Sequence, residues 1–123
     1  MRTDRELLLA AAAAAGVQLH EQPNIVSAEG KFLGLKAVNP QPRNSGERHR
    51  LWNPLFNDGE ALRLAVTLNM ELLRSTVNDP RPWVSAVIRN TTVHGAEDIG
   101  SDPHAATRRA IVRAAAEIGE AMP

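Results

Sequence analysis

The stretch from Trp52 to Leu68, which reads WNPLFNDGEALRLAVTL, constrains the fold more than any other part of the sequence. It holds an aromatic residue, a proline turn and a helix start in direct succession. Pro54 fixes a turn and pushes Asn53 before it into extended geometry. Asn57 or Asp58 can then cap the N-terminus of a helix. We therefore predict a helix at the centre of the chain, entered through a tight turn behind the tryptophan.

This central helix, over about residues 58–69, is apolar on two neighbouring sides. One face carries Leu62, Ala65, Val66 and Asn69, and the adjacent face carries Ala61, Leu64, Ala65 and Leu68. Residues 70–77 can either continue the helix or form a strand. We favour a strand, because Thr76 and Val77 lead directly into a turn at 78–82 that is rich in proline and polar residues.

A second helix is predicted at the start of the chain. Thr3 and Glu6 have the spacing of a capping box, and an alanine-rich run follows them. Gly16 is a natural stop for a helix, because glycine readily adopts the left-handed conformation of a helix end. The first helix is therefore expected over about residues 4–15.

A third helix is predicted to close the chain. Asp102 followed by Pro103 is a strong start signal, and the helical pattern continues to about Glu120. Its expected buried stripe consists of Ile111, Ala114, Ala115, Ile118 and Met122. Arg113 and Glu117, four residues apart, are expected to form an ion pair on another face.

Two hairpins complete the expected fold. The first pairs residues 24–27 with 31–35, the second pairs 71–77 with 83–92, and 93–101 is predicted to be a loop. The predicted fold class is α+β with the order α-β-β-α-β-β-α, in which the two hairpins form one antiparallel sheet with helices packed on one face. The length of 123 residues indicates a single domain, 1–123.

The segment 38–51 is predicted to be a long exposed loop, because it is rich in proline, asparagine, serine, glycine and arginine. Arg48, His49 and Arg50 make its end locally basic. A solvated loop explains this composition, and so does an arm that contacts an anion or a protein partner. The sequence leaves both interpretations open.

Composition limits the cellular compartment and the classes of partner that the protein can have. The chain has no cysteine, which excludes disulfides and thiolate chemistry and fits a reducing cytoplasm. Its formal net charge is zero, whereas a protein that binds the nucleic-acid backbone normally carries a basic excess. No stretch has the length and apolar character of a membrane span. We therefore expect a cytoplasmic protein without a membrane partner.

Catalytic and metal-ligating patterns are weak. The four histidines do not follow a zinc spacing, and no serine lies in a nucleophile motif, so we expect no metal, no cofactor and no enzymatic activity. Three segments, two of them basic and one a helix start, could nevertheless converge on a phosphate or nucleotide. They are Arg48, His49 and Arg50, Asp58 with the helix start that follows it, and Arg108, Arg109 and Arg113. A solvated helix face is the simpler interpretation of the last three arginines.

The two tryptophans are expected to play different roles. Trp52 beside its proline turn is typical of a core residue whose indole nitrogen finds a partner, although an indole can also stack on a base. Trp83 follows Pro82 and is expected to be more exposed. An exposed tryptophan on a sheet would be a binding hot spot.

Two blocks, WNPLFNDGEALRLAV and ATRRAIVRAAAEIGEAM, carry a family resemblance. Together with the opening TDRELLLAAAAAAGV they resemble small accessory proteins of tailed phages and prophages of Gram-negative bacteria, loosely the NinX-like proteins. The three blocks contain 47 of the 123 residues of the chain. The resemblance implies a phage-encoded protein in the host cytoplasm, and it implies no activity and no catalytic residues.

These observations lead to an expectation of a non-enzymatic accessory protein. It would bind a bacterial host protein or another copy of itself through segment 38–51 and the sheet face near Trp83, and so counter host defence. The alternative is a protein that sequesters a nucleotide or another phosphorylated signal molecule. A small enzyme is the third hypothesis. The residues expected to bind a ligand or partner are Trp52, Asn53, Asp58, Arg48, His49, Arg50, Trp83, Arg108, Arg109 and Arg113.

Overall fold

The computed structural model of the chain describes residues 2–39, 48–76 and 78–122. The elements in chain order are α1 (Asp4–Ala15), β1 (Leu19–Val26), β2 (Phe32–Val38), β3 (His49–Trp52), α2 (Asp58–Thr67), β4 (Met70–Arg74), β5 (Trp83–Ile88), β6 (His94–Asp98) and α3 (Pro103–Ala121). The predicted α+β class and the predicted order of three helices and two hairpins are confirmed. No helix in the described residues has the length and apolar character needed to cross a membrane.

The helices begin and end where local chemistry places them. The side-chain oxygens of Thr3, Asn57 and Asp102 each accept a hydrogen bond from the backbone N–H three residues further on. These bonds satisfy amides that would otherwise lack a partner at a helix start. Gly16 ends α1 with φ of 71°, a conformation that costs glycine little. The bounds predicted for all three helices are confirmed to within about two residues.

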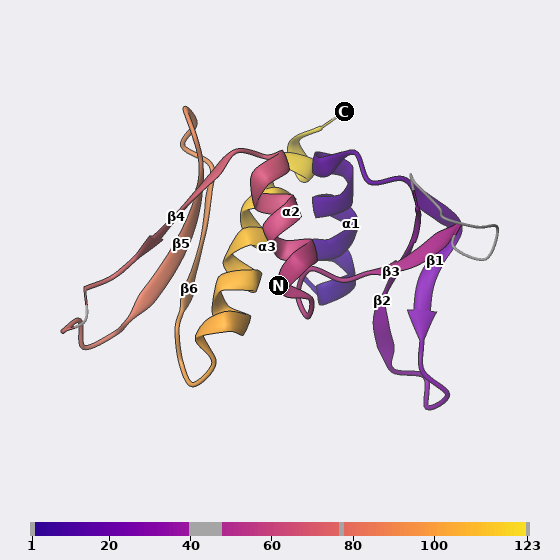
Figure 1. Ribbon diagram of the computed structural model, residues 1–123, viewed down its shortest axis with the longest axis horizontal. Coiled ribbons are helices and arrows are strands. Elements are labelled where there is room, and N and C mark those ends of the chain that lie inside the picture. Colours follow the sequence, from indigo (N-terminus) through magenta and orange to yellow (C-terminus); the bar gives the residue numbers. More distant parts are fainter. Residues whose placement is uncertain (1, 40–47, 77, 123) are drawn as a thin grey trace.

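The six strands form two separate sheets, and the prediction of one sheet is wrong. The first sheet has the order β1-β2-β3 and the second the order β4-β5-β6, and every pairing is antiparallel. Figure 1 shows the sheets on opposite sides of the molecule with the helices between them. Helices therefore cover the inner face of each sheet and do not gather on one side of a shared sheet.

Each hairpin gains a third strand that the sequence pattern did not indicate. Segment 38–51 was predicted to be a loop, but its last residues form β3, which pairs with β2 and brings Trp52 opposite Leu35. Residues 40–47 of the predicted loop lie outside the described residues. The segment predicted as a loop over 93–101 contains β6, which pairs with β5. The strand prediction for the start of 70–77 is confirmed, because β4 runs from Met70 to Arg74.

The core lies between the sheets and is built largely from alanine and aliphatic residues. Glycine lets α3 approach its neighbours closely. A Cβ added at Gly119 would fall 1.7 Å from the backbone oxygen of Ala10 in α1, and one at Gly95 would fall 2.3 Å from the oxygen of Ala110. Small side chains at such contacts bring backbones together and multiply dispersion contacts. The N-terminal part of the predicted stripe on α3, Ile111, Ala114 and Ala115, is buried, whereas Met122 at its end is exposed.

Candidate interaction surfaces

Two of the predicted binding residues, Trp52 and Asn53, belong to the core. Trp52 is 2% exposed, so its indole cannot stack on a ligand without opening the structure. Asn53 is also buried, and its amide holds the turn together. Its Nδ2 donates to the backbone oxygen of Leu33 at 2.7 Å, and its Oδ1 accepts from the amide of Leu55 at 3.1 Å. The prediction of a core role for Trp52 is confirmed, whereas contact of these two residues with a ligand stays a prediction that their burial does not favour.

The basic residues at 48–50 point in different directions, because two of them lie in a strand. Arg50 lies on the inner face of its sheet and forms a short ion pair with Glu60 of α2, a carboxylate that is itself buried. His49 lies on the outer face, where its ring meets that of His20 edge-on with centroids 4.9 Å apart. Arg48 is exposed just before the strand. These residues therefore do not form one anion-binding arm.

Partial desolvation lowers the pKa of His49, and the positive charges of Lys36, His20 and Arg48 lower it further. All of these neighbours are cationic or become cationic when protonated. The surface around His49 consequently disfavours a charged imidazole, and a protonated histidine there would find no carboxylate among these partners.

Arg108 and Asp58 are brought together as predicted, and their contact joins two helices. The guanidinium of Arg108 donates to the backbone oxygen of Leu55 at 2.8 Å and to Asp58 Oδ1 at 2.6 Å. The pair fastens the start of α2 to the first half of α3. Since both charges are matched, this contact stabilises the turn before α2 and leaves no surplus positive charge for a phosphate.

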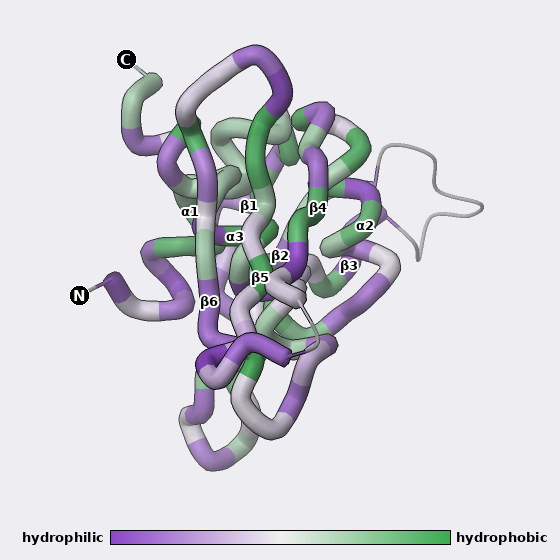
Figure 2. The backbone as a smooth tube through the Cα atoms, turned by 90° about the vertical axis from the view of Figure 1, so that its left-hand side faces the viewer, coloured by the Kyte–Doolittle hydropathy of each residue, from purple (hydrophilic) through white to green (hydrophobic). Residues whose placement is uncertain are grey.

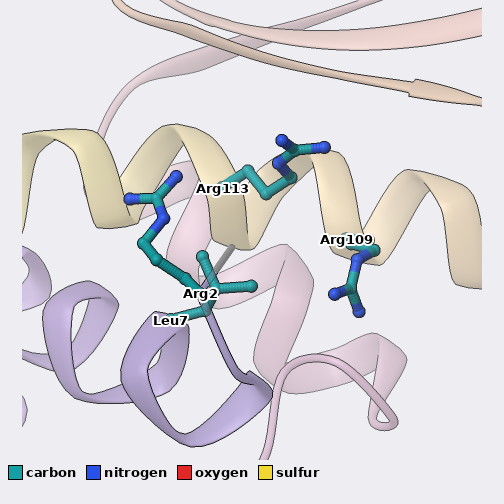
Figure 3. Close-up of a pocket in the computed structure, with 4 residues that line it drawn as sticks. All are labelled: Arg2, Leu7, Arg109 and Arg113. Carbon is teal, nitrogen blue, oxygen red and sulfur yellow. The ribbon is translucent and has the colours of Figure 1, made fainter.

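Arg2, Arg109 and Arg113 line a pocket of about 440 Å³ between the N-terminal segment and α3. Figure 3 shows that the three guanidinium groups do not point toward one common position. Arg109 contacts Asp4 at 3.1 Å and Glu97 at 3.1 Å, and Arg113 contacts Glu97 at 2.7 Å.

Carboxylates therefore occupy the place that a phosphate would take. Arg2 also has acidic partners, Glu117 at 3.5 Å and Glu120 at 2.6 Å. The predicted pair between Arg113 and Glu117 is wrong, because Arg113 reaches β6 and Glu117 faces Arg2. The nucleotide alternative stays a prediction. Thermal shift against a nucleotide panel tests it, since a ligand at a hundred times its dissociation constant adds about 2.7 kcal/mol.

Trp83 lies on the outer face of the β4-β5-β6 sheet, in agreement with the exposure predicted for it. Side chains alternate along β5, so that Val84, Ala86 and Ile88 are buried against the helices while Trp83 points to the other side. Figure 2 looks toward this sheet, and the helices lie behind it. Trp83 is 38% exposed, and Leu73 of β4 on the same face is 42% exposed.

Apolar side chains surround Ser85 on the outer face near Trp83. Ser85 lies opposite Leu73 on one side and Ala96 on the other, and it is only 8% exposed although no helix covers this face. Its neighbours therefore cover it. Exposed polar residues border the apolar layer, with Glu71 and His94 on the two sides of Val87 and Asp98 opposite Trp83. We call this surface, formed by Leu73, Trp83, Ser85, Val87 and Ala96, the outer-sheet surface.

A second apolar surface lies on α2 and was missed from the sequence. Leu62 and Val66 are 61% and 72% exposed, one helical turn apart. Together with Leu72 of β4 they form what we call the α2 ridge. The signal was present in the sequence, because this helix carries apolar residues on two neighbouring faces and only one of them can pack against the core.

Within the described residues, no group of three or more histidine, aspartate or glutamate side chains is arranged to hold a metal ion. The exposed apolar surfaces and the paired arginines are therefore the features from which a function can be inferred.

Comparisons of the chain with protein-family models, with curated proteins and with solved structures found no match. The resemblance to phage accessory proteins consequently stays a prediction from the quoted blocks.

Proposed function

We propose that this protein is a non-enzymatic binding protein that engages a bacterial host protein through the outer-sheet surface around Trp83. The observation that carries this proposal is an exposed tryptophan among apolar side chains on a sheet face that no helix of the described residues covers. Tryptophan is among the residue types most enriched at binding hot spots. Large exposed apolar patches on a folded protein mark interaction sites.

The charge pattern specifies the partner further. The apolar layer is bordered by Glu71 and Asp98, so a matching surface has an apolar centre and basic residues at its rim. Such a rim speeds association and selects the partner, while the desolvated centre around Trp83 supplies most of the affinity. The resemblance to phage accessory proteins supports the choice of a host protein as this partner, and a role in countering host defence belongs to the same proposal.

The proposal is tested by capture from host lysate with matched variants. Trp83→Ala should weaken binding of the captured protein by about 30-fold or more, the loss typical of a hot-spot residue. Leu51→Ala is the control, because Leu51, like Trp83, is an exposed apolar residue but lies on the other sheet. Its affinity for the same protein should be unchanged.

Equal capture by the wild-type chain and by Trp83→Ala would contradict the proposal. So would a partner that is lost with Leu51→Ala and kept with Trp83→Ala. Circular dichroism should show that both variants are folded, because both side chains are substantially exposed.

A further inference from the structure

A group of basic side chains lies on the first sheet, away from the outer-sheet surface. It consists of His20 of β1, Lys36 of β2, His49 of β3 and Arg48 directly before β3. We call these four residues the basic cluster. Figure 1 shows the first sheet on the opposite side of the helices from the sheet that carries Trp83. The basic cluster is therefore separate from the surface proposed to bind a host protein.

The strand register brings the members of the basic cluster together. The residues on either side of Lys36 are buried against the helices, so Lys36 points to the outer face of the sheet. Val38, two residues further on, lies opposite His49, which places His49 on the same face. The rings of His20 and His49 meet with centroids 4.9 Å apart. Because neighbouring strands are about 4.8 Å apart, the cluster spans only about 10 Å.

The positive charges of the cluster are not matched by acidic groups. Within the described residues, every charge that shifts the pKa of His49 is positive, namely Lys36, His20 and Arg48. Glu21, which follows His20 in β1, forms no ion pair with any described residue. In contrast, arginines that contact α2 and α3 pair with carboxylates. Like charges on neighbouring strands are destabilising, so an anion from outside would relieve this repulsion.

The cluster also offers hydrogen-bond donors that are not used inside the protein. His20 Nδ1 accepts from the backbone amide of Gln22 at 3.2 Å, so the proton of the neutral ring is on Nε2, which is left as a donor. The ammonium group of Lys36 and the guanidinium group of Arg48 carry further donors. Within the described part of the chain, neither side chain spends them on another residue.

We propose that the basic cluster binds the phosphate groups of a small phosphorylated molecule. A phosphate group carries close to two negative charges near neutral pH and three strong acceptor oxygens. These properties match a lysine, an arginine fork and imidazole donors gathered on one face. A nucleic-acid strand fits less well, because proteins that hold its backbone typically contact six to ten phosphates and carry a basic excess. This cluster spans about 10 Å, and the chain has a formal net charge of zero.

Binding at this site is coupled to protonation of His49. The pKa of His49 is lowered in the free protein by partial desolvation and by the positive charges of Lys36, His20 and Arg48. A phosphate beside the ring favours the charged imidazole and so raises this pKa. Linkage is reciprocal, so protonation of His49 strengthens phosphate binding by the same factor. Affinity should therefore increase as the pH falls below about 6.5.

Calorimetric titration of the full chain with inorganic triphosphate tests the site. Lys36→Gln should weaken binding by about 10-fold or more, the loss expected for one charge-assisted hydrogen bond. Arg48→Gln should do the same, and its exposed position keeps the fold intact. Lys31→Gln is the matched control, because Lys31 is exposed on the same sheet at the opposite end of β2, and its affinity should equal that of the wild type.

The same titration at about pH 5.5 and about pH 8, at constant ionic strength, tests the coupling. The gain in affinity at the lower pH should be about threefold or more greater for the wild type than for His49→Gln. Comparing the two proteins cancels protonation of triphosphate itself, since the second pKa of a phosphate is near 6. Imidazole resonances in nuclear magnetic resonance spectra should show that triphosphate raises the pKa of His49.

The proposal is overturned if the wild-type chain does not bind triphosphate at either pH, or if Lys36→Gln and Lys31→Gln bind it equally. Tighter binding of a single-stranded oligonucleotide than of triphosphate at the same ionic strength would also overturn it, in favour of a nucleic-acid site. Trp83→Ala should bind triphosphate like the wild type while losing the host protein. The two proposals therefore fail separately.

Discussion

At the scale of single residues, charged side chains in this protein fasten elements together. Glu60 illustrates this, since it is a buried carboxylate in the first turn of α2 that accepts a short contact from Arg50 of β3. Arg50 Nε is itself buried and, within the described residues, has no hydrogen-bond partner. The ion pair is therefore the main polar contact of both side chains, and it joins the first sheet to α2.

Glu60→Ala should lower the free energy of unfolding by about 1–3 kcal/mol, because it leaves the Arg50 guanidinium partly buried without its counter-charge. Urea denaturation measures the loss. Arg63→Ala is the control, since Arg63 contacts the same carboxylate at 3.4 Å from an exposed position and should cost less than about 1 kcal/mol. Equal losses in the two variants would contradict this account of the pair.

His49 predicts a pH dependence of stability. Its pKa is lowered in the folded protein, by partial desolvation first and then by neighbouring positive charges. The unfolded chain therefore binds more protons at this site just below about pH 6.5, and folding stability falls as the pH drops through that window. His49→Gln should be more resistant to acid than the wild-type chain while matching it at alkaline pH. Urea midpoints on both sides of the window check this, and parallel pH profiles for the two proteins would refute it.

At the scale of elements, close approach between backbones defines the helical layer. Gly119 in α3 faces Ala10 in α1 with no room for a side chain. Gly119→Ala should destabilise the fold by about 1–3 kcal/mol, because overpacking forces the two helices apart. Thermal and urea unfolding measure the change. Gly59→Ala in exposed α2 serves as the control and should stay within about 1 kcal/mol of the parent, as its nearest heavy atom is Asn57 Oδ1 at 3.3 Å.

The elements that could be predicted are those with a local signature. Caps and stops marked the three helices, and alternation with turn residues marked the central part of each hairpin. β6 escaped prediction because HGAED has no strand pattern of its own. Its strand conformation follows from pairing with β5 and from Gly95, which lets α3 approach closely. β3 was missed for the same reason, because it lies at the end of a polar segment and has no strand pattern of its own.

Contacts between residues far apart in sequence determine the features of the fold that local sequence patterns did not predict. Whether two hairpins join edge to edge or lie apart depends on which helices pass between them, and this packing involves residues far apart in sequence. The exposure of Trp83 was predictable because it follows a proline turn. The α2 ridge was only partly predictable, because two apolar faces on one helix indicate that one of them stays exposed without indicating which one. The ion pairs of the arginines were not predictable either, because their carboxylate partners, Glu97 and Glu60, come from other elements.

At the scale of the whole molecule, two sheets that share no hydrogen-bonded edge depend on one helical layer. α3 packs against α1, α2, β5 and β6, and α1 packs against β2, so the helices connect the two sheets mechanically. Neither sheet can keep its inner face buried when this layer is lost. The fold should therefore unfold as one unit, although its sheets are separate.

The two tryptophans make this prediction measurable, because Trp52 belongs to the first sheet and Trp83 to the second. Trp83→Phe leaves a fluorophore that reports the first sheet, and Trp52→Phe leaves one that reports the second. In each variant, tryptophan fluorescence and far-ultraviolet circular dichroism should follow the same urea transition, as two-state unfolding requires. Trp52→Phe should unfold at lower urea than Trp83→Phe, because Trp52 is 2% exposed and Trp83 38%, so the change at Trp52 removes more buried volume. A fluorescence transition that precedes the loss of helical signal in either variant would show that one sheet detaches first, and the helical layer would then not be what couples them.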